Sequence, residues 1–175
     1  MAFHLATKSA IQFLDESLSI SRKLDIRWSL AFSLEIMGLL QRSQGNCGRA
    51  ADLFRESLHL SAEQANQQGI ANCLGALAGL AVLATQPVRA ARLFAAAGEL
   101  RQAMGAKMGS DDQREYEHYL AVLRGQLDDT AFTAAWSEGR AMTTEQAIEE
   151  ASESGQSDWR SQFSMRTTSP DPVTD

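Results

Sequence analysis

The chain has 175 residues, of which 44% are hydrophobic and 22% are charged, and its formal net charge is −6. This length indicates one domain or one short repeat array and is sufficient for a buried core. Two cysteines exclude a disulfide framework and a four-cysteine zinc site, and the acidic balance argues against direct nucleic-acid binding. The longest apolar run, residues 70–84, is too short to span a membrane, and residues 1–10 lack the layout of a signal peptide. These exclusions together predict a cytoplasmic protein. Abundant Ala and Leu with few Val and Pro predict that it is all-helical.

The first predicted element is a helix over about residues 7–24, which we interpret as half of a repeat (residues 7–25). Three segments, residues 10–18, 50–58 and 90–98, align at one constant offset in the numbering. Only the first of them lacks a preceding helix in this register. We therefore expect that helix to expose the apolar side chains of Ile11, Leu14 and Leu18.

Two complete helix pairs follow, over residues 27–66 and 67–105. A second series of apolar residues has the same offset: Leu30, Ala31, Leu34 and Leu40 match Ile70, Ala71, Leu74 and Leu80. Both helices of the pair therefore repeat. Gly45 and Pro87 lie between helices, as a helix stop and a helix start do. Small residues recur where helices must approach closely, at Gly38, Ala78, Ala50 and Ala90.

Residues 110–151 are predicted to form capping helices. Ser110 with Gln113 fits a capping box that opens a helix to about residue 127, and Asp128 or Asp129 can cap a short helix with Trp136 in its core. Residues 143–146 open a last helix. Residues 152–175 are polar and contain two prolines, which predicts a disordered tail.

Charge is unevenly distributed along the chain. Residues 67–110 carry a net charge of +3, and residues 111–151 carry −7. The acidic segment is interpreted as a solvated face or, alternatively, as a docking surface for a basic partner or for the chain's own positive segment.

The repeated residues resemble the tetratricopeptide helix-turn-helix signature, which combines the small residues above with aromatic Phe54 and Phe94 and small Ser57 and Ala97. The spacing from Phe54 to Phe94 makes the unit here longer than the usual one of about 34 residues. The resemblance implies an all-α, antiparallel helix-pair, right-handed solenoid with a helical C-terminal cap.

The resemblance is more specific from residue 86 onward. Residues 87–106, 114–117 and 131–147 resemble the end of the tetratricopeptide region in large bacterial signalling ATPases and LuxR-type transcriptional regulators. We find no phosphate-binding loop and no basic helix-turn-helix segment after residue 151, so the resemblance implies only the sensing or scaffolding role of that region.

Residue patterns for catalysis or metal binding are not found. His4, His59 and His118 are isolated from one another, and Cys47 and Cys73 are interpreted as half-buried thiols. We therefore expect no enzyme activity, no cofactor and no metal.

The predicted function is a non-catalytic interaction module whose concave face binds a protein or peptide. The register places five residues on that face: Phe32, Glu35, Leu39, Arg42 and Asn72. The alternative is a small-molecule effector-sensing domain. The half repeat predicts self-association, or an open reading frame that is a separated piece of a larger regulator.

Overall fold

The computed structural model describes residues 2–153, with the side chains of all of these except residues 2–10 and 111. The described residues form eight α-helices and no strand, so the predicted all-helical class is confirmed. Apart from residues 152 and 153, the predicted disordered tail lies outside the described residues. The helices are α1 (Ala2–Lys23), α2 (Arg27–Ser43), α3 (Cys47–Glu63), α4 (Gln67–Leu83), α5 (Pro87–Ala103), α6 (Ser110–Gln126), α7 (Asp129–Ala141) and α8 (Thr144–Ser152).

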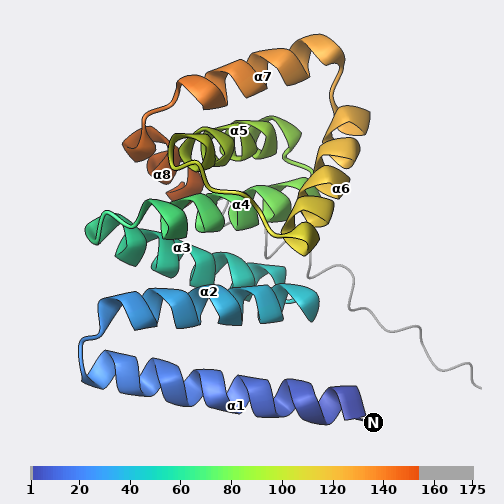
Figure 1. Cartoon of the computed structure of the whole chain (residues 1–175). Coiled ribbons are helices and arrows are strands. Elements are labelled where there is room, and N and C mark those ends of the chain that lie inside the picture. The colour runs from blue at the N-terminus through green and yellow to red at the C-terminus, as the bar shows by residue number, and fades with distance from the viewer. Residues whose placement is uncertain (1, 154–175) are drawn as a thin grey trace, which may run out of the picture.

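Helices α1 to α5 form an antiparallel stack in chain order, and α6 to α8 form a cap around its far end (Figure 1). Each helix of the stack packs on the next one along the chain. This arrangement is consistent with the predicted helical repeat solenoid. No helix among residues 2–153 combines the length and the apolar composition that a bilayer crossing requires.

The turns of the stack share one backbone conformation. A residue with positive φ recurs at every twentieth position, at Asp25, Gly45, Ala65, Thr85 and Gly105. In each turn the N–H of the next residue donates to a carbonyl five positions back, as Asn46 does to Gln41 at 2.9 Å. The structural unit is thus one helix with a short turn, and the sequence repeat contains two of them.

Helix α1 packs on α2 in the same way as α3 packs on α4. The Ser17 and Ser33 hydroxyls are 2.8 Å apart, and at the equivalent positions of the next repeat the Cys73 thiol donates to the Ser57 hydroxyl at 3.3 Å. The expectation that Ile11, Leu14 and Leu18 form an exposed face is wrong. Leu18 is 6% exposed, and Ile11 and Leu14 are half-buried, because this side of α1 packs against the cluster formed with α2 and α3.

Small residues let the aromatic side chains of the repeat enter the core. A Cβ at Gly38 would lie 2.6 Å from the ring of Phe54, which is fully buried. Ala78 and Phe94 are the equivalent buried residues of the next repeat. The prediction of close helix approach is therefore confirmed at Gly38, and Ala78 is fully buried at the equivalent position.

The regular spacing ends after α5. Each earlier turn has one residue between the positive-φ residue and the next helix, whereas residues 106–109 separate Gly105 from α6. Helix α6 leaves the stack, and α7 packs on α5 in its place (Figure 1). Gly139 permits this contact, because a Cβ there would lie 2.7 Å from Arg92 Cα.

The caps of the last helices follow local chemistry. Asp128 caps α7 by accepting from the N–H of Ala131 at 2.8 Å, one of the two predicted caps. The last helix begins within residues 143–146, as predicted, and the structure adds a capping box between Thr143 and Gln146. The predicted capping box at Ser110 is wrong, because Gly109 is the N-cap of α6 and makes no side-chain bond. Its predicted partner Gln113 instead donates to Glu117.

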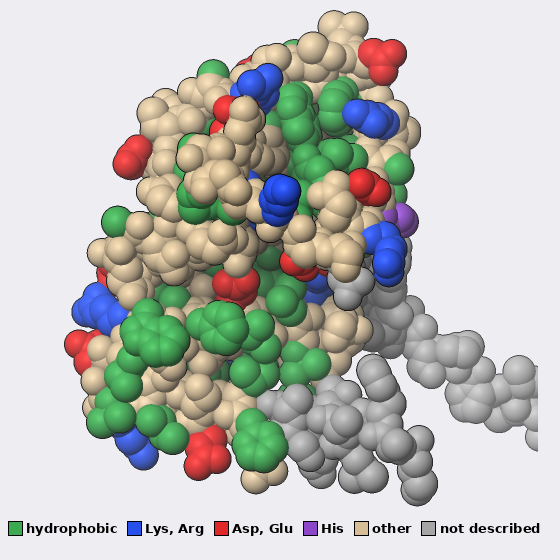
Figure 2. All heavy atoms as spheres, in the orientation of Figure 1, with side chains coloured by type: hydrophobic (Ala, Val, Ile, Leu, Met, Phe, Trp, Pro, Cys, Tyr) green, Lys and Arg blue, Asp and Glu red, His purple; other side chains and the backbone are tan. Residues whose placement is uncertain are grey.

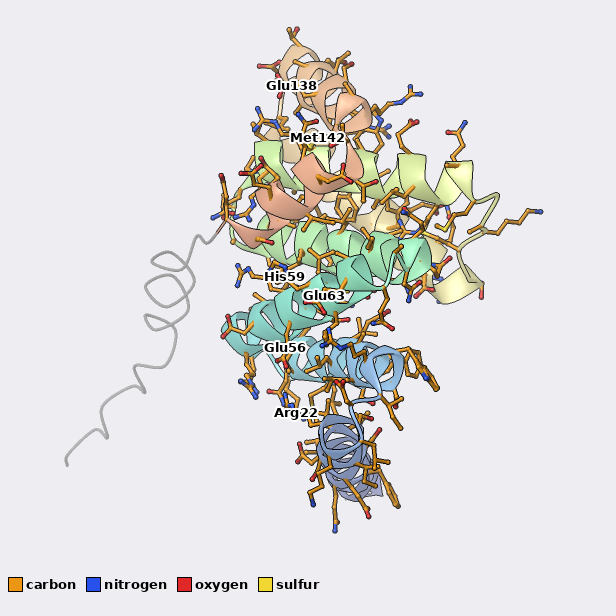
Figure 3. All side chains as sticks on the ribbon, turned by 90° about the vertical axis from the view of Figure 1, so that its left-hand side faces the viewer. Arg22, Glu56, His59, Glu63, Glu138 and Met142 are labelled. Atoms are coloured by element: carbon orange, nitrogen blue, oxygen red, sulfur yellow. The ribbon has the colours of Figure 1, made fainter. Side chains whose placement is uncertain are left out.

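Ion pairs tie successive layers together. Arg22 of α1 and Glu56 of α3 point toward each other in Figure 3, with an N–O distance of 3.0 Å. Between the stack and the cap, Arg92 of α5 pairs with Glu138 of α7 at 2.6 Å. Part of the acidic segment (residues 111–151) thus contacts the positive segment (residues 67–110) of the same chain. This contact is one of the alternatives considered for the acidic segment.

Candidate functional site

A cleft opens where α6 crosses the face of the stack formed by α2 and α4. It has a volume of about 220 Å³ and is called the concave cleft below. Four of the five predicted concave-face residues line it: Glu35, Leu39, Arg42 and Asn72. The fifth, Phe32, lies outside its lining and is 60% exposed on α2. Figure 2 shows acidic and basic side chains close together where α6 approaches α2.

A short hydrogen-bond chain joins α2 to α4 across the floor of the cleft. The amide of Asn72 donates to the Glu35 carboxylate at 3.1 Å, and the amide of Gln68 donates to Asn72 at 2.8 Å. Burial raises the pKa of Glu35 above its ordinary value, and the nearby Asp112 carboxylate adds to this rise. The Asn72 hydrogen bond and the Arg101 charge act in the opposite direction. Glu35 therefore retains its proton more readily than an exposed glutamate does.

Arg101 brings a positive charge from α5 into the cleft. Its guanidinium donates to the carbonyl of Ala71 at 3.0 Å, and a Cβ at Gly75 would lie 3.0 Å from the same nitrogen. Burial lowers the pKa of Arg101, whereas Tyr116, Asp112 and Glu35 raise it. The guanidinium remains charged because its ordinary pKa is far above neutral. Gly75 thus gives a half-buried cation access to the cleft.

Helix α6 forms the opposite wall. Glu115 pairs with Arg42 of α2 at 2.7 Å, so an ion pair joins the two walls of the cleft. A Cβ at Gly79 would lie 2.9 Å from the ring of Tyr119, so α6 rests directly on α4. Burial raises the pKa of Tyr119, and its hydroxyl therefore stays protonated at neutral pH.

The residues from α5, α6 and the loop between them are missing from the sequence-based prediction. Their charged and tyrosine members are Arg101, Lys107, Asp112, Glu115, Tyr116 and Tyr119. One signal was present in the sequence. Gly75 and Gly79 lie one helical turn apart, so they leave a bare strip on α4 that other side chains can cover.

The two cysteines and Trp136, singled out in the sequence, lie in or against the core. Both cysteines are buried rather than half-buried, and burial raises the pKa of Cys73 to about 12. Trp136 stacks on Phe132 and packs against the core, as predicted. Among the described residues, no group of three or more His, Cys, Asp or Glu side chains is arranged to hold a metal ion.

Comparison with known proteins finds one distant relationship. Proteins named "Putative HTH-type transcriptional regulator" in Mycobacterium bovis and in two strains of Mycobacterium tuberculosis are 30% identical to this chain over 121 residues. The match covers 69% of the chain but only 14% of each relative. No family model matches, and no solved structure matches. The chain is therefore distantly similar to a small part of regulator-like proteins.

Proposed function

We propose that this chain is a non-catalytic ligand-binding module related to transcriptional regulators, and that the concave cleft captures a small polar effector. The observation that carries the proposal is the convergence of charged groups from α2, α5 and α6 on one cavity of about 220 Å³. A cavity of about 150 Å³ holds a benzene molecule, so this cleft has room for a compact molecule of about amino-acid size.

The charges of the cleft favour a ligand that carries both signs. Arg101 and Lys107 offer cationic donors to a carboxylate, and Glu35 and Asp112 offer acceptors to an amine. The tyrosines of α6 supply flat apolar surface and hydroxyl groups beside them. We therefore propose a zwitterionic small molecule as the ligand class. The net negative charge of the chain favours such a ligand over DNA.

Binding without chemistry is supported by the state of the side chains around the site. Arg42 is engaged by Glu115, and Asn72 by Glu35 and Gln68, which holds these groups in fixed orientations for recognition. The nearby thiol of Cys73 is held protonated by burial and does not supply a nucleophile.

The test is a thermal-shift screen followed by calorimetry with amino acids, dicarboxylic acids, polyamines and neutral sugars. We expect amino-acid-like zwitterions to raise the melting temperature. Arg101→Gln and Asn72→Ala should each weaken the binding of such a ligand at least tenfold, whereas Arg49→Ala, which removes a cation outside the cleft, should leave it unchanged. A screen in which only neutral sugars stabilise the protein, or none of these compounds does, would contradict the proposal.

A peptide is the second candidate, because Trp28 and Phe32 extend the cleft-facing side of α2. They are 66% and 60% exposed and lie on the same helical face as Glu35 and Leu39. A peptide could lie on these aromatic rings and insert one polar side chain into the cleft. The double variant Trp28→Ala/Phe32→Ala should then abolish binding of a peptide selected from a display library, while binding of a free zwitterion is retained.

A further inference from the structure

Exposed apolar side chains form a stripe along α1 that continues onto Leu24, the residue after its last turn. Phe13, Ile20 and Leu24 follow one helical face and are 72%, 47% and 64% exposed. Figure 2 shows hydrophobic side chains gathered at this end of the molecule, over α1 and α2. Contiguous exposed apolar surface of this kind marks an interaction site.

The repeat identifies the positions in the stripe as helix-packing positions. At the constant offset of the repeat, Phe13 corresponds to Leu53 of α3 and Ile20 to Leu60. Leu53 is 3% exposed, and both leucines pack α3 against its neighbours in the stack. Within the described residues, no helix covers these positions on α1. The stripe is therefore the same packing surface, left uncovered by residues 2–153.

Two charged residues beside the stripe indicate which occupant fits. Glu16 and Lys23 are exposed on the same side of α1, two turns apart, and form no ion pair with another described residue. If a second α1 lies antiparallel across the stripe, with a two-fold axis between residues 19 and 20, each Glu16 lies opposite the other Lys23. The same arrangement places Ile20 at the axis and each Phe13 near the other Leu24. A parallel arrangement would instead bring like charges together.

We propose that this stripe binds a second copy of the chain, forming a symmetric dimer through antiparallel α1 helices and two Glu16–Lys23 ion pairs. The interface is self-complementary, as a two-fold interface requires. Its apolar centre supplies the affinity, and its charges set the register.

The first test measures the molecular mass of the full chain by light scattering and sedimentation across a wide range of protein concentration. We expect a concentration-dependent dimer. Phe13→Glu/Ile20→Glu should raise the dissociation constant roughly a hundredfold or more while the circular dichroism spectrum stays unchanged, because both side chains are exposed in the monomer. Leu83→Glu, at an exposed position on α4 outside the stripe, is the matched control and should remain dimeric. A wild-type monomer at every concentration, or a double variant that still dimerises like the wild type, would overturn the proposal.

The second test addresses the occupant and its register. Glu16→Lys and Lys23→Glu should each weaken the homodimer roughly tenfold, because each places two like-charged pairs across the interface. A mixture of the two variants should form a heterodimer with affinity near that of the wild type. In that heterodimer the two substituted side chains face each other with opposite charges, and the retained Lys23 of one chain faces the retained Glu16 of the other. Failure of the mixture to recover affinity would overturn the antiparallel arrangement.

Discussion

The stack and the cap are both helical, but they differ in the lengths of their helices and in how the helices are joined. In the stack, α2 to α5 each have 17 residues and are joined by turns that repeat one conformation at even intervals. In the cap, the helices have 17, 13 and 9 residues, and α7 and α8 begin at side-chain caps. The concave cleft lies where α6 crosses from one part to the other. The repeat thus supplies a uniform scaffold, and its interruption supplies the different charged groups that a binding site needs.

The largest expected effect is a loss of stability at the contact between the cap and the stack. Gly139→Ala should lower the free energy of unfolding by about 2–4 kcal/mol, because the new Cβ overlaps the backbone of Arg92 and forces α7 away from α5. Denaturant titration measures the loss, and hydrogen exchange should show lost protection in α7 and α8 with α2 and α3 protected as before.

Gly98→Ala is the matched control for this substitution. Gly98 lies inside α5 with open space around its missing side chain, so alanine should stabilise the helix by about 0.5–1 kcal/mol. If Gly139→Ala proved as stable as Gly98→Ala, the close contact between α7 and α5 would be incorrect.

The next effect tests the uniform turns of the stack. Thr85 is a β-branched residue with φ of 57°, a conformation that glycine adopts without steric cost. Thr85→Gly should therefore stabilise the protein by about 1 kcal/mol, measured by thermal and denaturant unfolding. At the equivalent position of another turn, Gly45→Ala should destabilise it by a similar amount. Changes of the same sign in both variants would contradict a shared turn conformation.

The smallest effect concerns the cleft and depends on pH. The pKa of Glu35 is higher in the folded protein than in the unfolded chain, so the stability it contributes is present below its unfolded pKa and is lost as pH rises through its folded pKa. Glu35→Gln should therefore be more stable than the wild type at pH 7, by less than about 1 kcal/mol. The difference should vanish below about pH 4, where both side chains are neutral. Unfolding measured at both pH values checks this, and a wild type that is more stable than the variant at pH 7 would contradict it.

The sequence predicted the stack well because repetition is visible in the residues. The constant offset located the helices, and the 3–4 spacing on α2 selected Glu35, Leu39 and Arg42 for the face that lines the cleft. The exposed face of α1 was misplaced. The prediction assumed that Ile11, Leu14 and Leu18 had lost their partner, whereas the next helix covers them and the unpaired side contains Phe13.

The opposite wall of the cleft could not be predicted, because nothing local determines how far a chain turns after a break in its repeat. Residues 106–109 replace the single linking residue of the other turns, and the path of α6 then depends on contacts distant in sequence. Tyr119 rests on Gly79, and Glu115 reaches Arg42 of α2. Helical spacing describes neighbours within a helix and not such contacts.

The hydrogen bond between Asn72 and Glu35 has a mechanical consequence. It joins α2 to α4 along the inner side of the stack, while α3 lies between them in the chain. The bond restrains the separation of these two helices on that side of the stack. If the proposed ligand binds in the cleft, a molecule that inserts between Glu35 and Asn72 would push α2 and α4 apart, and one that bridges them would hold the two helices together. Under that proposal, the curvature of the stack is linked to what occupies the cleft.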